Sequence, residues 1–250
     1  MGLLIALLGI LFIAVFADVH LRLSYYLDPY SRFSNLSRLQ FEGLRNMLAV
    51  AKAYVGFKII RDSRLKQKLP KRFLIISNHQ SLADIAVLAY SFPRHNVRFV
   101  AKKELKYGVP AISFTLRKAE HALVSRKGDF RAARSELLRL ARLASRQPIC
   151  PTVFPEGTRS KSGKVNRFHS AAVRTILGRC PMPALSVAVD GGYRISRLMD
   201  LIRNIRGCKY RVRLLSLYPP VWERRRIQEM LEKAHDEIKR QVEEWRRNEN

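Results

Sequence analysis

The chain has 250 residues, of which 47% are hydrophobic and 27% are charged, a composition typical of a globular protein rather than a disordered one. Its 47 Lys and Arg against 20 Asp and Glu give a net charge of +27, so we expect a polyanionic partner: nucleic acid, an anionic membrane surface or a phosphorylated substrate. The three cysteines are widely spaced and form no C-x-x-C pair, so neither a disulfide framework nor a zinc site is predicted.

The N-terminal segment, residues 2–17, is apolar and carries no charge. As a helix it would be about 24 Å long, which is marginal against a hydrocarbon core of about 30 Å. No basic n-region precedes it, so a signal peptide is not predicted. With the basic amphipathic stretch over residues 41–60 it could form a hairpin in one leaflet, it could cross the membrane alone, or it could be a buried core helix. The arginines that follow favour a main body on the cytoplasmic face of the cell membrane.

From about residue 70 onward, short apolar strands alternate with amphipathic helices. We expect strands over residues 73–77, 97–101, 122–125, 149–154, 184–189 and 210–217. We expect helices over residues 82–92, 109–118, 129–146, 168–177, 195–205 and 223–247, with Gly178 ending the fourth. Strands that are apolar throughout lie in sheets covered on both faces, so we predict an α/β fold with a central, mostly parallel sheet covered by helices.

The sequence S-N-H-Q-S-L-A-D-I, residues 77–85, follows the first of these strands and places an imidazole and a carboxylate five positions apart. Ser81 and Asp84 have the spacing of a capping box at the start of a helix. His79 precedes that cap, and side chains of a first helical turn point back toward the N-terminus, so His79 and Asp84 can meet. Either Asp84 only caps the helix, or it orients His79 as a general base.

A second polar stretch, T-V-F-P-E-G-T-R-S-K-S-G-K over residues 152–164, also follows an apolar strand. Its glycines nearly fit a P-loop, but the gap is one residue too long and Val165 stands where Ser or Thr would hold magnesium. A glycine turn carrying Glu156 and Arg159 remains, which suits a phosphomonoester as well as it suits a solvated basic turn. The other histidines show no ligand spacing, so we predict neither a metal nor another cofactor.

Together, N-H-Q-S-L-A-D and F-P-E-G-T-R-S resemble the N-H-x-x-x-x-D and F-P-E-G-T-R-S blocks of the glycerolipid acyltransferases typified by 1-acyl-sn-glycerol-3-phosphate acyltransferase, in the same order and about 75 residues apart. The segments A-K-K-E-L-K-Y-G-V-P and H-A-L-V-S-R resemble two further family segments, and the resemblance covers roughly residues 70–190. It departs at residues 120–126, 168–172 and 183–187, which leaves the exact acceptor open.

The resemblance implies a reaction and a set of site residues. His79 would take the proton of an acceptor hydroxyl as it attacks an acyl thioester, and Asp84 would hold the imidazole. The acceptor site would be formed by Arg126, Glu156, Gly157, Thr158 and Arg159, with Lys102 and Lys103 adding positive potential. The donor would be acyl carrier protein or coenzyme A. The acceptor would be 1-acyl-sn-glycerol-3-phosphate, giving phosphatidic acid in phospholipid biosynthesis, or alternatively another lysolipid or amphiphilic alcohol.

The predicted organisation is therefore a membrane-associating pair of helices over residues 1–60 and an acyltransferase domain over residues 61–250 that ends in a charged helix. An anionic membrane would account for much of the positive charge. The competing class is a basic, non-enzymatic protein that binds nucleic acid or an anionic membrane. That class explains the net charge but leaves the two motif blocks as accidents, so we expect no nucleic acid as a partner.

Overall fold

The computed structural model describes residues 2–28, 30, 32–108, 112–125 and 129–248. Within these residues a seven-stranded sheet has the order β1-β7-β6-β2-β5-β3-β4. Its strands are β1 Lys58–Ser63, β2 Leu74–Ser77, β3 Asn96–Lys102, β4 Ala122–Val124, β5 Ile149–Val153, β6 Ala184–Asp190 and β7 Lys209–Tyr218. All neighbouring pairs are parallel except β6 and β7. The predicted α/β fold with a mostly parallel sheet is confirmed.

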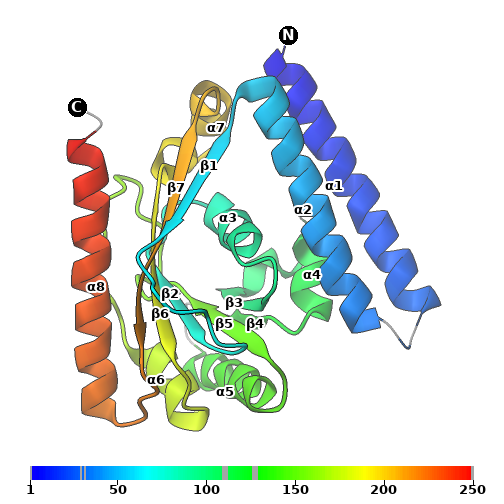
Figure 1. The fold of residues 1–250 in the computed structure, drawn as a ribbon. Coiled ribbons are helices and arrows are strands. Elements are labelled where there is room, and N and C mark those ends of the chain that lie inside the picture. Colours follow the sequence, from blue (N-terminus) through cyan, green and yellow to red (C-terminus); the bar gives the residue numbers. More distant parts are fainter. Residues whose placement is uncertain (1, 29, 31, 109–111, 126–128, 249–250) are drawn as a thin grey trace.

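Helices cover both faces of the sheet (Figure 1). Their bounds are α1 Gly2–Leu27, α2 Arg32–Val55, α3 Ala83–Ser91, α4 Ile112–Lys118, α5 Phe130–Arg146, α6 Ala171–Arg179, α7 Leu198–Asn204 and α8 Arg224–Arg247. Helices α5, α6 and α8 pack on one face, against Leu74 and Ile76 of β2. Helices α2 and α3 pack on the other face, against Ile75 of the same strand. Side chains alternate between the faces of a strand, so an uninterrupted apolar strand contributes to both cores.

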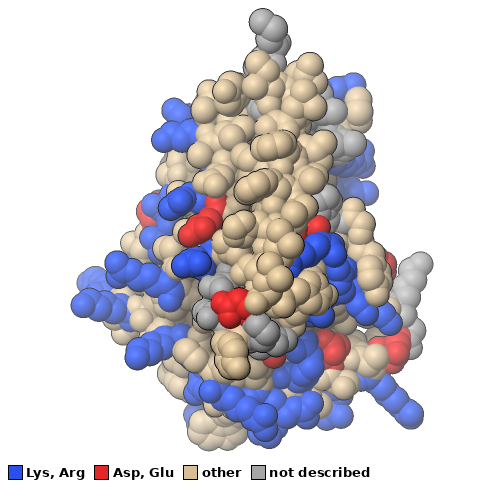
Figure 2. Space-filling model, turned by 90° about the vertical axis from the view of Figure 1, so that its right-hand side faces the viewer, with Lys and Arg blue, Asp and Glu red and all other residues tan. Residues whose placement is uncertain are grey.

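Helices α1 and α2 lie side by side as an antiparallel pair at one edge of the molecule (Figure 1). Small residues let them approach, because a Cβ atom on Gly9 or Gly43 would lie 3.3 Å from Val50 or Ala17 of the other helix. Large apolar side chains of α1 recur at helical spacing along its exposed side: Leu4, Leu8, Leu11, Phe12, Val15, Phe16, Val19 and Leu23. Figure 2 shows a ridge without charged residues along this side of the molecule, with Lys and Arg on both flanks.

The segment Leu7–Leu27 is long and apolar enough to cross a membrane, and 6% of it is buried. A buried core helix would show the opposite exposure, so that interpretation of the N-terminus is wrong. A large exposed apolar surface of this kind is consistent with membrane association.

The second helix begins and ends earlier in the chain than the amphipathic stretch over residues 41–60 that the sequence indicated, since it starts at Arg32. Helix α2 ends at Val55, and Gly56 follows with a φ of +67°, a conformation that glycine adopts without strain. Lys58–Ser63 then forms β1, which pairs with β7 in parallel register. The predicted domain boundary after residue 60 therefore falls inside a strand of the sheet, and the helix pair is covalently and structurally continuous with it.

Three other helical predictions need correction. Gly178 does not end a helix, since α6 continues to Arg179 and is closed by Cys180. The helix expected from residue 168 begins at Ala171. The helix expected over 195–205 is shorter, since α7 begins at Leu198, and Ile195 is the last residue of a preceding 3-10 turn, η2 (Gly192–Ile195). For the helix expected over 109–118, the first three positions lie outside the described residues, and α4 occupies the rest.

Candidate active site

The N-H-Q-S-L-A-D segment leaves the sheet at the carboxyl end of β2. The Asn78 side chain continues the ladder there: its Nδ2 donates to the Val189 carbonyl, and its Oδ1 accepts from the Val189 N–H, both at 2.9 Å. These two hydrogen bonds pair the backbone N–H and carbonyl of Val189 on β6, although the chain after β2 turns away from the sheet. In a mostly parallel sheet the carboxyl ends of neighbouring strands meet at one edge, so His79 emerges beside the ends of β3 and β5.

His79 and Asp84 are in direct contact, as the sequence predicted. The two atoms His79 Nδ1 and Asp84 Oδ2 are 2.6 Å apart, and the Asp84 side chain is fully buried. The same Oδ2 accepts from the N–H groups of Gln80 at 2.6 Å and Ser81 at 2.9 Å, and Ser81 Oγ accepts from Ala83 N–H at 3.2 Å. One carboxylate thus caps the start of α3 and also holds the imidazole.

Tyr210 is a fourth partner of Asp84 that sequence reasoning missed. It is fully buried on β7, and its hydroxyl donates a hydrogen bond to Asp84 Oδ1. Burial and the neighbouring carboxylate hold the pKa of Tyr210 well above its ordinary value, so the hydroxyl keeps its proton and remains a donor. In the sequence Tyr210 is one apolar position of a strand, and no local pattern distinguishes it.

The F-P-E-G-T-R-S turn clamps the backbone of His79 from both sides. Glu156 Oε1 accepts from His79 N–H at 2.8 Å, and the His79 carbonyl accepts from Ser160 N–H at 2.7 Å. Glu156 Oε2 accepts from Asn166 N–H at 2.9 Å. Glu156 was expected in the acceptor site, and it lines the same cavity as His79. Its carboxyl group is buried and accepts from two backbone N–H groups. Its geometry is that of a positioning residue for His79.

Burial also raises the pKa of Glu156 to about 7, against the opposing effect of the two backbone N–H bonds. The imidazole of His79 stacks on Phe154 with a centroid separation of 4.1 Å. Because Nδ1 is bonded to Asp84, the tautomer that donates to this carboxylate leaves Nε2 with a free lone pair. His79 lines a cavity of about 970 Å³, and Nε2 is the nitrogen that can accept a proton from a molecule bound there.

This cavity has an apolar and a cationic part. The apolar lining comes from α3, α5 and the ends of β3, β4 and β5: Leu82, Ile85, Val100, Val124, Phe130, Val153 and Phe154. The cationic lining consists of Lys102, Arg159, Lys161 and Arg197. Such a cavity is chemically matched to an amphiphile with an apolar chain and an anionic group. Arg197, which precedes α7, was not predicted as a site residue, since no motif surrounds it.

The remaining predicted residues are placed as follows. Gly157 (φ +67°), Thr158 and Arg159 line the cavity, and Arg159 Nη1 is 3.4 Å from the Ser196 carbonyl. Lys102 also lines it, and its Nζ is 3.8 Å from Glu104 Oε1. Lys103 is exposed in the 3-10 turn η1 (Lys103–Lys106) and is not part of the lining. Arg126 lies outside the described residues, directly after Ser125, which lines the cavity.

Known proteins resemble the chain in both sequence and fold. A family model described as acyltransferase matches residues 60–189, more than half of the chain. A curated 1-acyl-sn-glycerol-3-phosphate acyltransferase from Cocos nucifera is 27% identical over 165 residues, which are 66% of this chain and 52% of that protein, so the match spans about half of the relative's length. The crystal structure of the 1-acyl-sn-glycerophosphate (LPA) acyltransferase PlsC from Thermotoga maritima has a TM-score of 0.68 at 21% identity over 98% of both chains, which shows the same fold.

Proposed function

The chain belongs to the acyltransferase family, and we propose that it transfers an acyl chain from an acyl thioester to the free hydroxyl of 1-acyl-sn-glycerol-3-phosphate, giving phosphatidic acid. The observation that carries this proposal is the cavity itself. His79, held by Asp84, lies between an apolar lining that suits acyl chains and cations that suit a phosphate. The name of the Cocos nucifera relative supports the same substrate class.

In the proposed reaction His79 acts as the general base. Nε2 takes the proton of the acceptor hydroxyl as its oxygen attacks the thioester carbonyl, and the imidazolium formed is stabilised by Asp84. The tetrahedral intermediate collapses with loss of the thiolate, which takes the proton from Nε2. An ester and a free thiol are formed, and the imidazole returns to its starting state. No covalent enzyme intermediate is needed.

Substrate binding would be divided between the two parts of the cavity. Arg159, Lys161 and Arg197 are placed to bind the acceptor phosphate, with Arg159 offering a bidentate guanidinium. The donor is acyl carrier protein or coenzyme A; both are acidic, and a net charge of +27 favours their approach.

We also propose that the enzyme is bound to the cell membrane with its catalytic domain on the cytoplasmic face. Helix α2 returns along α1, so α1 could cross the bilayer only if α2 entered it with Arg45 and Lys52. The exposed apolar side chains of α1 are better accommodated if the helix pair lies in one leaflet. There the Lys and Arg residues on both flanks meet anionic headgroups (Figure 2).

A product assay tests the proposed reaction. The purified full-length protein is offered a labelled acyl thioester with 1-acyl-sn-glycerol-3-phosphate, 1-acyl-sn-glycerol and a panel of zwitterionic lysolipids, and the products are identified. We expect phosphatidic acid as the main product, and a higher acceptor KM in Arg159→Ala with little change of kcat. Preferred acylation of the phosphate-free or zwitterionic acceptors, or an unchanged KM in Arg159→Ala, would contradict the proposal.

A further inference from the structure

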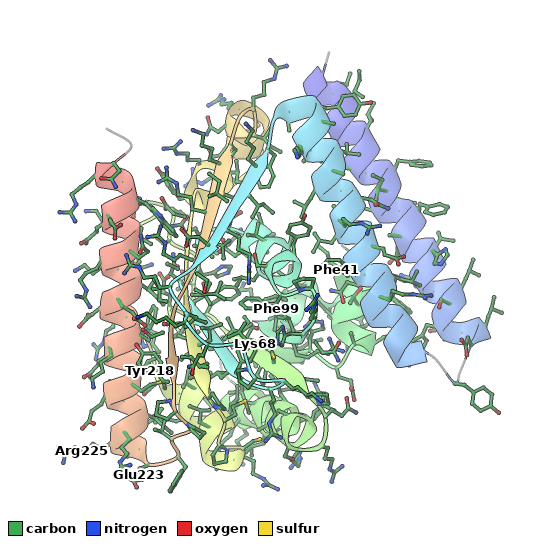
Figure 3. All side chains as sticks on the ribbon, in the orientation of Figure 1. Phe41, Lys68, Phe99, Tyr218, Glu223 and Arg225 are labelled. Carbon is green, nitrogen blue, oxygen red and sulfur yellow. The ribbon has the colours of Figure 1, made fainter. Side chains whose placement is uncertain are left out.

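A second hollow lies at the start of β3, whereas the active site lies at the end of this strand. It is situated between α2 and the turn that joins α3 to β3. It consists of two adjoining cavities of about 620 and 500 Å³. We call it the α2 groove and define it by the residues that line both cavities: Phe41, Arg45, Phe92, Pro93, Arg94 and His95. Figure 3 shows Phe41 on the side of α2 that faces the sheet.

The α2 groove is distinct from the active-site cavity. Strand β3 contributes its first residues, Asn96–Phe99, to the groove and its last residues, from Val100 to Lys102, to the active site. Seven residues of strand separate the two ends by about 20 Å. The rings of Phe99 and Phe154 stack at 6.3 Å, and each faces a different cavity, so aromatic side chains close the space between them.

Arginines dominate the polar lining of the α2 groove. Arg45 and Arg94 line both cavities, Arg38 and the buried Arg98 line the first, and Arg61 lines the second. In the described part of the chain, no ion pair with a carboxylate is formed by the guanidinium groups of Arg38, Arg45, Arg61 and Arg94. The acidic residue in the lining is Glu42. Several arginines around one hollow, with one carboxylate among them, create a site for an anion.

The base of the groove is apolar and aromatic. Phe41 stacks on Tyr90 with a centroid separation of 6.1 Å, and Phe92 packs edge-on against Phe73. His95 packs against the same two phenylalanine rings, and burial together with the charge of Arg61 lowers its pKa. His95 is therefore neutral at pH 7 and belongs to this base rather than to the cationic rim.

We propose that the α2 groove binds the phosphate of an anionic phospholipid headgroup, as a site separate from the one that binds substrate. Guanidinium groups bind phosphate oxygens in bidentate fashion, and an aromatic base suits the glycerol and first methylene groups of a lipid. The position of the groove beside the membrane-associating helices favours a lipid over a soluble anion as its ligand. Arg38, Phe41 and Arg45 lie on one side of α2, and another side of this helix packs on α1, whose exposed stripe is apolar.

Titration of the detergent-solubilised full-length protein with short-chain lipids tests this site. Dihexanoyl phosphatidylglycerol, which is neither substrate nor product, should bind saturably, and dihexanoyl phosphatidylcholine and inorganic phosphate should each bind at least about tenfold more weakly. The double variant Arg45→Ala/Arg94→Ala should lose about tenfold or more in affinity for phosphatidylglycerol, since each lost charged hydrogen bond weakens binding by about this factor.

Matched variants separate the groove from the other sources of binding. The variant Lys52→Ala/Lys58→Ala removes two exposed charges that lie close to the groove but outside it. Arg159→Ala removes a cation of the active-site cavity. Both variants should bind phosphatidylglycerol as tightly as the wild type does. If the alanine pair in the groove fails to fold, Arg45→Lys/Arg94→Lys keeps the charge and should still bind several-fold more weakly. The proposal would be overturned if the Lys52/Lys58 variant lost as much affinity for phosphatidylglycerol as the groove variant, or if only Arg159→Ala lost affinity. It would also be overturned if inorganic phosphate bound as tightly as phosphatidylglycerol.

Discussion

Tyr210 donates its hydroxyl to Asp84 Oδ1, on the side of the carboxylate opposite to the bond with His79. Asp84 therefore receives donors on both oxygens, and no freedom remains for it to rotate. The two residues come from α3 and β7, elements that are 126 positions apart in the chain. The orientation of the imidazole thus depends on a strand that is distant in sequence and is separated from β2 in the sheet by β6.

Tyr210→Phe should lower kcat by about tenfold. The substitution removes one hydrogen bond to a buried carboxylate, which typically stabilises by about 1.5–3 kcal/mol, and leaves the aromatic ring in the core. The acceptor KM should not change, since Tyr210 does not line the cavity. Steady-state kinetics in detergent provide both values. A kcat equal to that of the wild type would mean that Asp84 holds His79 without this donor.

Gly192→Ala should disturb the same pair sterically. A Cβ atom at this position would clash with Tyr210 Oη and lie 3.0 Å from Asp84 Oδ1, both of which are buried. We expect a lower melting temperature and a lower kcat. Gly178→Ala is the matched control, since nothing lies within 4 Å of its added Cβ atom inside α6. There alanine should stabilise the helix by about 0.5–1 kcal/mol and leave kcat unchanged. Similar behaviour of the two variants would contradict the packing described around Asp84.

The titration of Glu156 should make the free energy of unfolding fall as the pH rises. Its pKa is about 7 in the folded protein and 4.5 ordinarily, so between these values the folded state holds a proton that the unfolded state has released. Raising the pH through this window therefore lowers the free energy of unfolding, by up to about 3 kcal/mol. Glutamine does not titrate. The melting temperature of the wild type minus that of Glu156→Gln should decrease from pH 4.5 to 7, and a constant difference would show that Glu156 is ionised throughout.

The membrane proposal depends on the exposed stripe of α1. Each large apolar side chain buried in lipid contributes about 1.5–3 kcal/mol irrespective of salt, whereas the attraction of Lys and Arg to anionic lipid is screened by salt. High salt should leave the wild type on membranes, and detergent should release it. Leu8→Ser/Phe12→Ser/Phe16→Ser should become extractable by salt, while Trp222→Ser, an exposed aromatic residue away from α1, should not. Complete release of the wild type by salt would contradict embedding of α1.

Much of the fold followed from local patterns. Six strands and the start of α3 could be predicted because apolar runs and capping residues are local signals. Strand β1 was missed because Lys58–Ser63 is charged and mostly exposed, and its residues continue the amphipathic pattern of α2. The strand order and the antiparallel placement of β7 depend on pairing between distant segments, about which hydrophobic periodicity is silent.

The contact between His79 and Asp84 was predictable because both residues flank one helix cap. The contacts that support it were not. Tyr210 reaches Asp84 from a distant strand, and Glu156 holds a backbone N–H, an interaction that any carboxylate in any turn could make. Such contacts arise from the tertiary arrangement, so the sequence indicated the contact between His79 and Asp84 better than the residues that position this pair.

The kcat of His79→Ala tests the central claim most directly. The variant is assayed with an acyl thioester and 1-acyl-sn-glycerol-3-phosphate, beside His20→Ala as a control at an exposed position on α1, and the melting temperature of each is measured. If His79 is the general base, its loss should lower kcat by roughly 100-fold or more with a melting temperature close to that of the wild type, and His20→Ala should remain fully active. A folded His79→Ala protein with near-normal kcat would contradict the account, because Asp84 would then only cap α3.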